Sequence, residues 1–187
     1  MSKRFDIIET AIEGVFILKR ARLADERGFL TRLFSPADLC DAGWVGTVEQ
    51  INETGTRFQG TVRGMHFQNP PFTEIKLVTC TAGAILDVAV DLRKGSPTFL
   101  KHTAVELSAD NDCSLLIPNG CAHGFQALTD NVRMIYAHSA PYSAEAEGGL
   151  HCEDPALGIE WPLPVANLSA RDASHAPLGS DYVGIAA

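Results

Sequence analysis

The sequence lacks any long apolar run. No stretch approaches the about 18 residues that a helix needs to cross a bilayer. The start of the chain has neither the apolar core nor the small-residue cleavage site of a secretory signal. We therefore expect no membrane span and a cytoplasmic location. Basic residues are also scarce, since 15 Lys and Arg face 23 Asp and Glu and give a net charge of −8. This balance disfavours nucleic acid and anionic membranes as partners.

The sequence also lacks closely spaced cysteines and histidines. Its five cysteines are odd in number and widely separated, and no CxxC pair occurs. Reduced core thiols are therefore favoured over disulfides or a thiolate metal site. No HxH pair is present either, although a β domain that binds a metal through histidines would need one on a strand. We expect no metal.

Internal repeats, low-complexity tracts and interdomain linkers are absent as well. The chain has 187 residues, of which 45% are hydrophobic, and this length allows one domain with a sizeable core. We therefore expect a single domain over residues 1–187, in which about residues 165–187 form a short helical or irregular tail.

What the chain does contain is a series of short apolar runs separated by turn residues, recurring every eight to twelve residues. This spacing is typical of a β-sandwich or jelly roll. Two short helices are indicated, one over residues 36–42 and one opening within residues 168–172. The predicted strands lie within residues 5–22, after a turn at 25–28, and at 48–52, 60–67, 75–82, 84–91, 101–107, 114–117, 122–128 and 132–138.

Three local expectations follow from this pattern. Residues 53–57 should form a loop, and the strands at 122–128 and 132–138 should form a hairpin around Asp130. The strand at 84–91 is nearly alternating, with one polar face that carries Asp87 and Asp91. The predicted fold class is all-β, a jelly-roll β-sandwich with a few short peripheral helices.

Ionisable residues gather around one stretch, residues 60–93, which sets Arg63, His66 and Lys76 among apolar strand signals. A hydrogen-bonded core histidine and a catalytic one fit the periodicity of His66 equally well. The surrounding residues favour a site, because His123, Tyr136 and Asp172 can line the same concave face. A structural core would not collect so many ionisable groups, since each costs several kcal/mol to bury unpaired.

The residue types in this set suit acid–base chemistry at carbon without a cofactor. A histidine has an unperturbed pKa of about 6.5 and can remove a proton near neutral pH. A carboxylate such as Asp172 on its other nitrogen would fix the tautomer. Tyr136 can return a proton from the other side, and Lys76 can hold the oxyanion that forms between the two steps.

Nine short segments occur in the order found in one enzyme family. On these segments, over about residues 5–175, the chain resembles the dTDP-4-dehydrorhamnose 3,5-epimerases. The segments are DERGF (25–29), QIN (50–52), VRGMHFQ (62–68), KLV (76–78), DVAVDLR (87–93), SPTF (96–99), IPNGCAHGF (117–125), WP (161–162) and LSARD (168–172).

The resemblance implies an isomerase with a cupin-like jelly roll that acts as a homodimer in deoxysugar, rhamnose or polysaccharide biosynthesis. It implies a nucleotide-diphosphate-linked 4-keto-6-deoxyhexose as substrate, with thymidine favoured, and inversion of C3, C5 or both. It implies no cofactor. By position, His66 resembles the catalytic base, Asp172 its dyad partner, Tyr136 the general acid and Lys76 the residue near the C4 oxygen.

The resemblance also implies a set of substrate-binding residues. Arg27 resembles an arginine that reaches the nucleotide from the neighbouring subunit, so the N-terminal segment should complete the neighbour's site. Tyr142 resembles an aromatic that stacks on the base. Arg32 takes a position where the family carries a glutamate that contacts the nucleotide. The full set is Arg63, Gln50, Asn52, His123, Arg27, Tyr142, Arg32 and Arg171.

Several alternatives stay open. The enzyme can act at only C3 or only C5, or on a sugar carried by another nucleotide, and a ketoisomerase of related fold is a more distant option. A non-catalytic sugar-nucleotide binding module would be expected to lose His66, Tyr136 or Asp172, which are all present. A metal-dependent oxygenase of the cupin type is disfavoured by the missing HxH.

Other polar residues receive simpler interpretations. Trp44 and Trp161 are expected to be packing residues. A solvated acidic face is predicted for Glu145, Glu147, Glu153 and Asp154, and no partner is predicted for the histidines His102, His138, His151 and His175.

Overall fold

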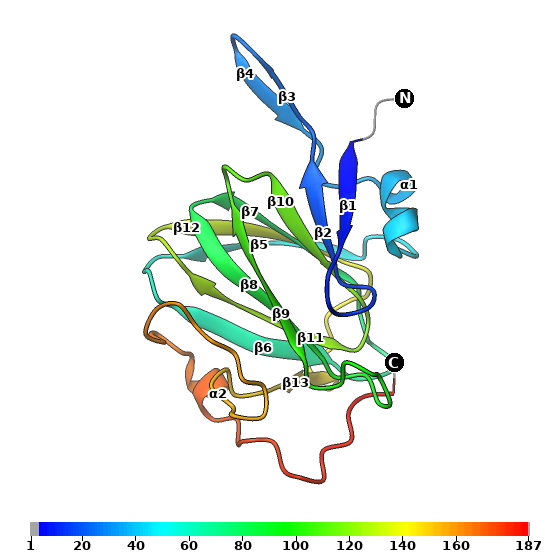
Figure 1. Cartoon of the computed structure of the whole chain (residues 1–187), viewed down its shortest axis with the longest axis vertical. Coiled ribbons are helices and arrows are strands. Elements are labelled where there is room, and N and C mark those ends of the chain that lie inside the picture. The colour runs from blue at the N-terminus through cyan, green and yellow to red at the C-terminus, as the bar shows by residue number, and fades with distance from the viewer. Residues whose placement is uncertain (1–3, 187) are drawn as a thin grey trace.

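The computed structural model describes residues 4–186, so residues 1–3 and 187 of the expected domain lie outside it. Its main strands form two antiparallel sheets of six and five strands that pack face to face (Figure 1). The predicted all-β jelly-roll sandwich is confirmed. No helix in the described part of the chain has both the length and the apolar character needed to cross a membrane.

The strands of each sheet come from distant parts of the chain. The six-stranded sheet contains, in spatial order, β1 (Phe5–Glu9), β2 (Phe16–Arg20), β10 (Cys113–Ile117), β7 (Lys76–Ala82), β12 (Val132–His138) and β5 (Gln50–Thr56). The five-stranded sheet contains β13 (Glu147–Gly149), β6 (Val62–Gln68), β11 (Cys121–Ala127), β8 (Ala84–Asp91) and β9 (His102–Ser108). The remaining elements are the hairpin of β3 (Arg22–Asp25) and β4 (Gly28–Thr31), the helices α1 (Pro36–Leu39) and α2 (Ala170–Ala173), and a 3-10 turn, η1 (Cys40–Ala42).

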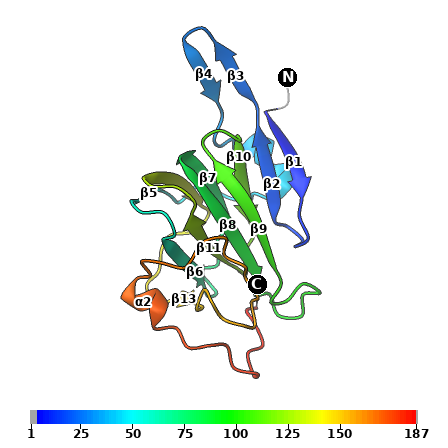
Figure 2. The same cartoon turned by 60° about the vertical axis from the view of Figure 1, so that its left-hand side comes forward.

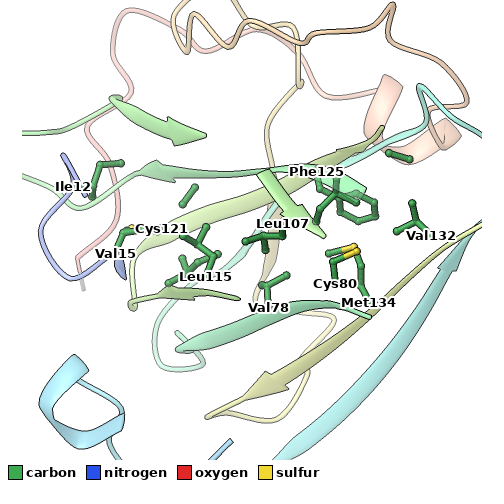
Figure 3. Close-up of a cluster of buried hydrophobic side chains, with 14 residues drawn as sticks. Ile12, Val15, Val78, Cys80, Leu107, Leu115, Cys121, Phe125, Val132 and Met134 are labelled. Atoms are coloured by element: carbon green, nitrogen blue, oxygen red, sulfur yellow. The ribbon is translucent and has the colours of Figure 1, made fainter. Parts of the chain in front are cut away.

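The main core lies between the two sheets, where alternate residues of each strand meet. Val78 and Leu115 from the six-stranded sheet share this cluster with Leu107 and Phe125 from the five-stranded sheet (Figure 3). All four are almost fully buried. Burying such a side chain contributes about 1.5–3 kcal/mol relative to leaving it exposed, so this layer supplies much of the driving force for sandwich formation.

The outer faces of both sheets are covered as well. Leu77 of β7 packs with Leu39 of α1 and with Trp44, which confirms Trp44 as a packing residue. On the other side, Val88 of β8 packs with Ile185 from the C-terminal segment. Because neighbouring residues of one strand are buried on opposite faces, the central strands have continuous apolar runs instead of strict alternation.

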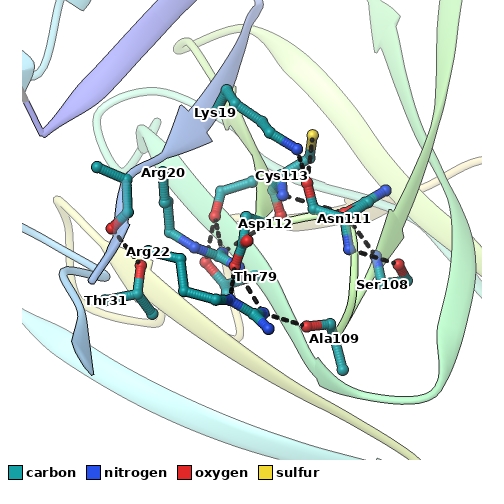
Figure 4. A network of polar contacts seen from close by, with 12 residues as sticks. Lys19, Arg20, Arg22, Thr31, Thr79, Ser108, Ala109, Asn111, Asp112 and Cys113 are labelled. Atoms are coloured by element: carbon teal, nitrogen blue, oxygen red, sulfur yellow. Dashed lines mark hydrogen bonds and ion pairs between the residues drawn. The ribbon is translucent and has the colours of Figure 1, made fainter. Parts of the chain in front are cut away.

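The β3–β4 hairpin projects away from the sandwich, as both views show (Figures 1 and 2). A polar network fixes its base (Figure 4). The guanidinium of Arg22 donates to Oδ1 of Asp112 at 3.0 and 2.7 Å, and Arg20 donates to Oγ of Ser114 at 2.6 Å. Arg22 also lies over the ring of Phe29, 4.1 Å from its centroid. These contacts set the direction in which the chain leaves β2.

The predicted loop at residues 53–57 is wrong, because β5 extends to Thr56 and pairs with β12 from Gln50↔His138 to Thr56↔Val132. Main-chain pairing does not require apolar side chains. The polar composition of this stretch reflects an edge strand whose side chains face a pocket, as described below.

The predicted hairpin at 122–138 is also wrong. β11 pairs with β6 and β8 in one sheet, whereas β12 pairs with β5 and β7 in the other. The short connection at 128–131 therefore crosses between the sheets. Turn residues alone do not distinguish this crossing from a hairpin, because both need a tight reversal.

Asp87 and Asp91 lie on one face of β8, as predicted, and both are fully buried. Asp91 accepts hydrogen bonds from Arg93, Ser96 and Thr98, which offset the cost of burying its charge. The five cysteines are free thiols, as predicted. The short strand β13 was not predicted.

The five-stranded sheet has one very close contact, between Gly64 of β6 and Gly124 of β11. A Cβ atom on Gly64 would lie 2.5 Å from Cα of Gly124 and 2.8 Å from the carbonyl oxygen of His123. The φ angle of Gly64 is +123°, in the region that favours glycine. This approach places His66 and His123 in register on neighbouring strands.

We predict that Gly64→Ala lowers the free energy of unfolding by about 2–5 kcal/mol, from the clash together with the positive φ. Gly55→Ala is the matched control, because a Cβ there meets nothing within 4 Å. Its effect should stay within about 1 kcal/mol. Urea denaturation of both variants measures the difference, and equal midpoints would contradict the assignment.

Candidate active site

A pocket of about 1130 Å³ lies between the two sheets and is lined by both. The six-stranded sheet contributes residues of β5, β7 and β12, and the five-stranded sheet contributes residues of β6 and β11. The pocket brings together ten of the predicted site residues: His66, Tyr136, Asp172, Lys76, Arg63, Gln50, Asn52, His123, Tyr142 and Arg171.

His66 and Asp172 form a hydrogen-bonded pair in this pocket. Nε2 of His66 lies 2.7 Å from Oδ1 of Asp172. Ser169 caps α2 by accepting the backbone N–H of Asp172 at 3.0 Å, which fixes the start of this one-turn helix. The Asp172 side chain is 4% exposed and that of His66 is 28% exposed. The carboxylate is therefore buried behind an imidazole that faces the pocket.

A second neighbour approaches the same ring nitrogen, because Nη2 of Arg171 lies 3.1 Å from Nε2 of His66. One nitrogen cannot donate to Asp172 and accept from Arg171 at once. We assign the proton on Nε2 to the shorter contact with Asp172. Arg171 then acts on His66 as a nearby positive charge, and the lone pair of Nδ1, for which the described residues offer no hydrogen-bond partner, is left free.

The electrostatics of the pair agree with a neutral imidazole. Burial lowers the pKa of His66 below 6.5, and the hydrogen bond and charge of Asp172 only partly offset this effect. For Asp172, burial raises the pKa, but the contacts with His66 and Ser169 outweigh it and hold the pKa below its ordinary value. At neutral pH the pair is thus an ionised carboxylate and a neutral histidine with a free lone pair, which is the state that a general base requires.

Tyr136 lies on β12, in the opposite sheet from His66. Its ring meets that of His123 edge-on at 5.8 Å and stacks on that of His138 at 6.1 Å. Burial strongly raises the pKa of the Tyr136 hydroxyl. The phenol is therefore protonated at neutral pH and can act as a proton donor.

Lys76 opens β7 and its side chain is only 9% exposed. Its Nζ atom lies 3.1 Å from Oε1 of Glu74. A buried ammonium is stable only with such a partner. The pair places a positive charge in a pocket shared with His66 and Tyr136, where it can stabilise a developing oxyanion.

A second histidine–carboxylate pair lies deeper in the pocket. Nε2 of His123 is 2.7 Å from Oδ1 of Asp87, and both side chains are buried. Burial raises the pKa of Asp87, although His123 opposes this shift. Asp87 Oδ2 has no partner among the described residues. Asp87 thus orients His123 from behind.

The rim of the pocket carries further polar groups. Glu147 accepts hydrogen bonds from the hydroxyl of Tyr142 at 2.9 Å and from Arg171 at 2.7 Å. Gln50 accepts the backbone N–H of Tyr142 at 3.0 Å. Arg63 is oriented by Thr56 and Gly55 of β5, each at 3.2 Å. The rim therefore presents two guanidinium groups and an exposed phenol, a combination suited to a ligand with anionic and aromatic parts.

No cluster of three or more metal-ligating side chains occurs among residues 4–186. Each of the pocket's three histidines, His66, His123 and His138, instead pairs with one carboxylate. The pocket thus combines acid–base groups, His66 and Tyr136, with one ammonium group, that of Lys76.

Comparison with known proteins identifies the same family that the sequence segments resemble. The family model described as dTDP-4-dehydrorhamnose 3,5-epimerase matches residues 9–180. A dTDP-4-dehydrorhamnose 3,5-epimerase of Sinorhizobium fredii is 42% identical over 173 residues, which cover 90% of this chain and 87% of that protein. The chain belongs to the dTDP-4-dehydrorhamnose 3,5-epimerase family. It is accordingly an epimerase, an enzyme of the isomerase class, as the sequence predicted.

Solved structures of related enzymes share the fold. The epimerase of Legionella pneumophila, solved with dTDP-4-keto-L-rhamnose, has a TM-score of 0.87 and 37% identity, and 91% of each chain is covered. A 3′-monoepimerase of Streptomyces bikiniensis, solved with dTDP-quinovose, has a TM-score of 0.85 and 31% identity, and covers 91% of this chain and 86% of its own.

Two of the predicted site residues lie outside the pocket of this epimerase chain. Arg27 is at the tip of the β3–β4 hairpin, where it pairs with Asp25, and its side chain is 84% exposed. Arg32 follows the hairpin and pairs with Asp38 of α1 at 2.8 Å. Neither residue contacts the pocket of its own chain, so any role in substrate binding requires a second subunit.

The structure also corrects several predictions for polar residues of this epimerase. Glu147 lies in the pocket, and Asp154 is buried, where it accepts the backbone N–H groups of Ala156 and Leu178. These two residues are not part of a solvated face. His138 also has a partner, because its Nδ1 atom lies 2.8 Å from Oε2 of Glu74. Acidic residues in an irregular segment resemble surface residues in sequence, and only the tertiary fold buries them.

Sequence reasoning missed Glu74 altogether. The residue follows the Pro70-Pro71 break and has an acidic side chain in a turn-like segment, which by itself is typical of a surface residue. Its spacing from Lys76 was the available signal, because residues i and i+2 of an extended segment point to the same side.

We predict that His66 titrates with a pKa below 6.5 and that Asp172→Asn lowers this pKa further, because the carboxylate that favours the imidazolium is lost. NMR titration of the ring protons measures both values, and the missing signal in His66→Asn assigns the resonance. Asp154→Asn, which removes a buried carboxylate elsewhere, should leave the His66 titration unchanged. An unchanged or raised pKa in Asp172→Asn would contradict the pairing.

Proposed function

We propose that this chain epimerises a dTDP-linked 4-keto-6-deoxyhexose at both C3 and C5. The observation that carries the proposal is a neutral histidine, oriented by a buried carboxylate, that shares one pocket with a protonated tyrosine and a lysine. C3 and C5 both neighbour the C4 ketone, so the same groups can serve both carbons in turn.

In the proposed reaction, Nδ1 of His66 removes the proton from the carbon next to the ketone. The electron pair of the broken C–H bond moves into an enolate, whose negative charge falls on the C4 oxygen. The ammonium of Lys76 stabilises this oxygen. Tyr136 then donates its proton to the opposite face of the carbon, and the enolate returns to the ketone with inverted configuration. His66 releases its proton to solvent, and the tyrosinate takes one up.

The rate enhancements expected from these groups are adequate for such a reaction. Positioned acid–base groups typically contribute about 10²–10⁴-fold each, and one preorganised oxyanion donor contributes about 10²–10³-fold. Asp172 contributes through His66, because it fixes the tautomer and stabilises the imidazolium that forms. The chemistry assigned here uses side chains of the chain itself.

Substrate binding in this proposal uses the rim. Arg63 and Arg171 present guanidinium groups to the diphosphate, and Tyr142 offers an exposed ring for stacking on the base. Gln50 and Asn52 of β5 offer amide groups to the sugar and ribose. The remaining proposed contact is between His123, held by Asp87, and the hexose.

The proposal includes a homodimer in which Arg27 and Arg32 contact the partner's nucleotide. The hairpin that carries Arg27 projects from the sandwich and exposes apolar side chains, with Phe29 59% and Leu30 70% exposed. Exposed apolar groups of this kind are typical of association surfaces. A monomeric mass in solution would contradict this part of the proposal. The cytoplasmic location stays a prediction.

The second candidate is inversion at C3 alone. It is favoured by the similarity to a 3′-monoepimerase, which has this fold at 31% identity. The two candidates differ in how long the intermediate stays in the pocket and in which carbon reaches His66, and the residues assigned above serve either one.

We predict that His66→Asn abolishes exchange of substrate hydrogen with solvent deuterium, because no base remains to form the enolate. Tyr136→Phe should abolish net inversion but retain measurable exchange, since deprotonation and reprotonation by His66 on one face need no acid. NMR in heavy water follows both processes. Circular dichroism and thermal unfolding check that both variants fold. Retained exchange in His66→Asn would contradict the assignment of the base.

A further inference from the structure

A third carboxylate–histidine pair lies beside the two already described. Glu74 uses both oxygens: Oε1 is 3.1 Å from Nζ of Lys76 and Oε2 is 2.8 Å from Nδ1 of His138. The three side chains are 7%, 9% and 11% exposed, respectively. All three line the pocket. A carboxylate shared in this way is held at two points, which fixes its position better than a single ion pair would.

The sheet register creates this arrangement. His138, the last residue of β12, pairs with Lys76, the first residue of β7, and on its other side with Gln50 of β5. Glu74 lies two residues before Lys76. The backbone nearby is tied down as well, because Ile75 N–H donates to Oγ of Ser139 at 2.8 Å and Ser139 N–H donates to the carbonyl of Ile75 at 3.1 Å. The geometry therefore results from β-sheet pairing.

One tautomer of His138 satisfies both of its neighbours. Nε2 of His138 faces the side-chain nitrogen of Asn52, an amide donor, at 3.4 Å. A ring nitrogen that accepts there leaves the proton on Nδ1, which donates to Glu74. The result is a continuous hydrogen-bonded series from Asn52 through His138 and Glu74 to Lys76. It joins β5, which contributes residues to the substrate pocket, to the lysine of the reaction.

The charge state of Glu74 fits this arrangement. Burial raises the pKa of its carboxyl group, but the hydrogen bond from His138 and the charge of Lys76 outweigh burial and hold the pKa below its ordinary value. The carboxylate is therefore ionised at neutral pH, and it can attract an ammonium whose flexible four-carbon stem would otherwise occupy several rotamers.

We propose that Glu74 is a positioning residue for the epimerisation, which holds the Lys76 ammonium where the enolate oxygen forms, and that His138 holds Glu74. This inference rests on the role proposed above for Lys76. Glu74 acts through Lys76, and its effect belongs to the step in which the enolate forms. That step is common to hydrogen exchange and to inversion.

The test is a set of variants assayed for both processes. Glu74→Ala should lower kcat by about 10²-fold, the loss that misplacement of a reacting group by about 1 Å causes, with KM changed less than about threefold. Deuterium exchange and net inversion should fall by the same factor, unlike in Tyr136→Phe, where exchange survives. Glu74→Gln should recover most of the activity, because its amide oxygen can still accept from Lys76. His138→Phe keeps an aromatic ring beside Tyr136 and should lower kcat by a smaller factor, about tenfold. Exchange and inversion should again fall together in this variant.

Asp154→Asn is the matched control. It removes a buried carboxylate outside the pocket, so it can lower thermal stability, but kcat of the folded enzyme should stay at the wild-type value. If Glu74→Ala does not fold, the loss of kcat in His138→Phe carries the test. The inference is overturned if folded Glu74→Ala or His138→Phe keeps wild-type kcat, if only KM changes, or if exchange survives while inversion is lost. Failure of the proposed function is a separate result, because it would appear as absence of exchange and inversion in the wild-type enzyme.

Discussion

The hydrogen bond between His66 and Asp172 is the contact on which the site depends, and it joins residues 106 positions apart. Two parts of the fold make it possible. β6 lies between β11 and β13, which places His66 inside the five-stranded sheet. The C-terminal segment then returns across this sheet, where the bridge between Thr61 and Ala166 sets its path just before α2. The C-terminal tail is thus needed for the site as well as for covering the sheet.

The same physical device occurs three times in the pocket. Asp172, Asp87 and Glu74 each bind one ring nitrogen of a histidine, at 2.7, 2.7 and 2.8 Å. Each carboxylate thereby fixes the tautomer and orientation of its ring, while the ring reduces the cost of burying the charge. The three differ in surroundings. Lys76 also pairs with Glu74, whereas Asp87 is fully buried with His123 as its hydrogen-bond partner, and burial raises the pKa of Asp87.

Much of the fold follows from the sequence, because short apolar runs between turn residues specify strands wherever both sheet faces are covered. The errors have a common origin. Whether β11 and β12 form a hairpin or belong to different sheets depends on which partners each strand finds, and the turn residues are compatible with both. The polar strand β5 was mistaken for a loop beyond Asn52 because main-chain pairing leaves no mark in side-chain composition.

For the site, the sequence indicated which residue types gather and predicted the pairing of His66 with Asp172, but it did not predict the carboxylate partners of His123 and His138. His66, Lys76, Tyr136 and Asp172 were identified by chemical type and by family resemblance, and the structure places them in one pocket. The Glu74–His138 contact spans 64 residues and arises from the register of β7 with β12. The sequence offers only the spacing of Glu74 from Lys76 as a signal, and a pairing with His138 that is set by register becomes visible only in the folded chain.

The central claim is that one proton-exchange site serves both carbons that flank the ketone. The most direct measurement is the position of deuterium in the product that the wild-type enzyme forms from a dTDP-linked 4-keto-6-deoxyglucose in heavy water. NMR and mass spectrometry should find one deuteron at C3 and one at C5, both in inverted configuration. Deuterium at a single carbon would show that the enzyme is a monoepimerase. Product without deuterium would contradict proton exchange at either carbon.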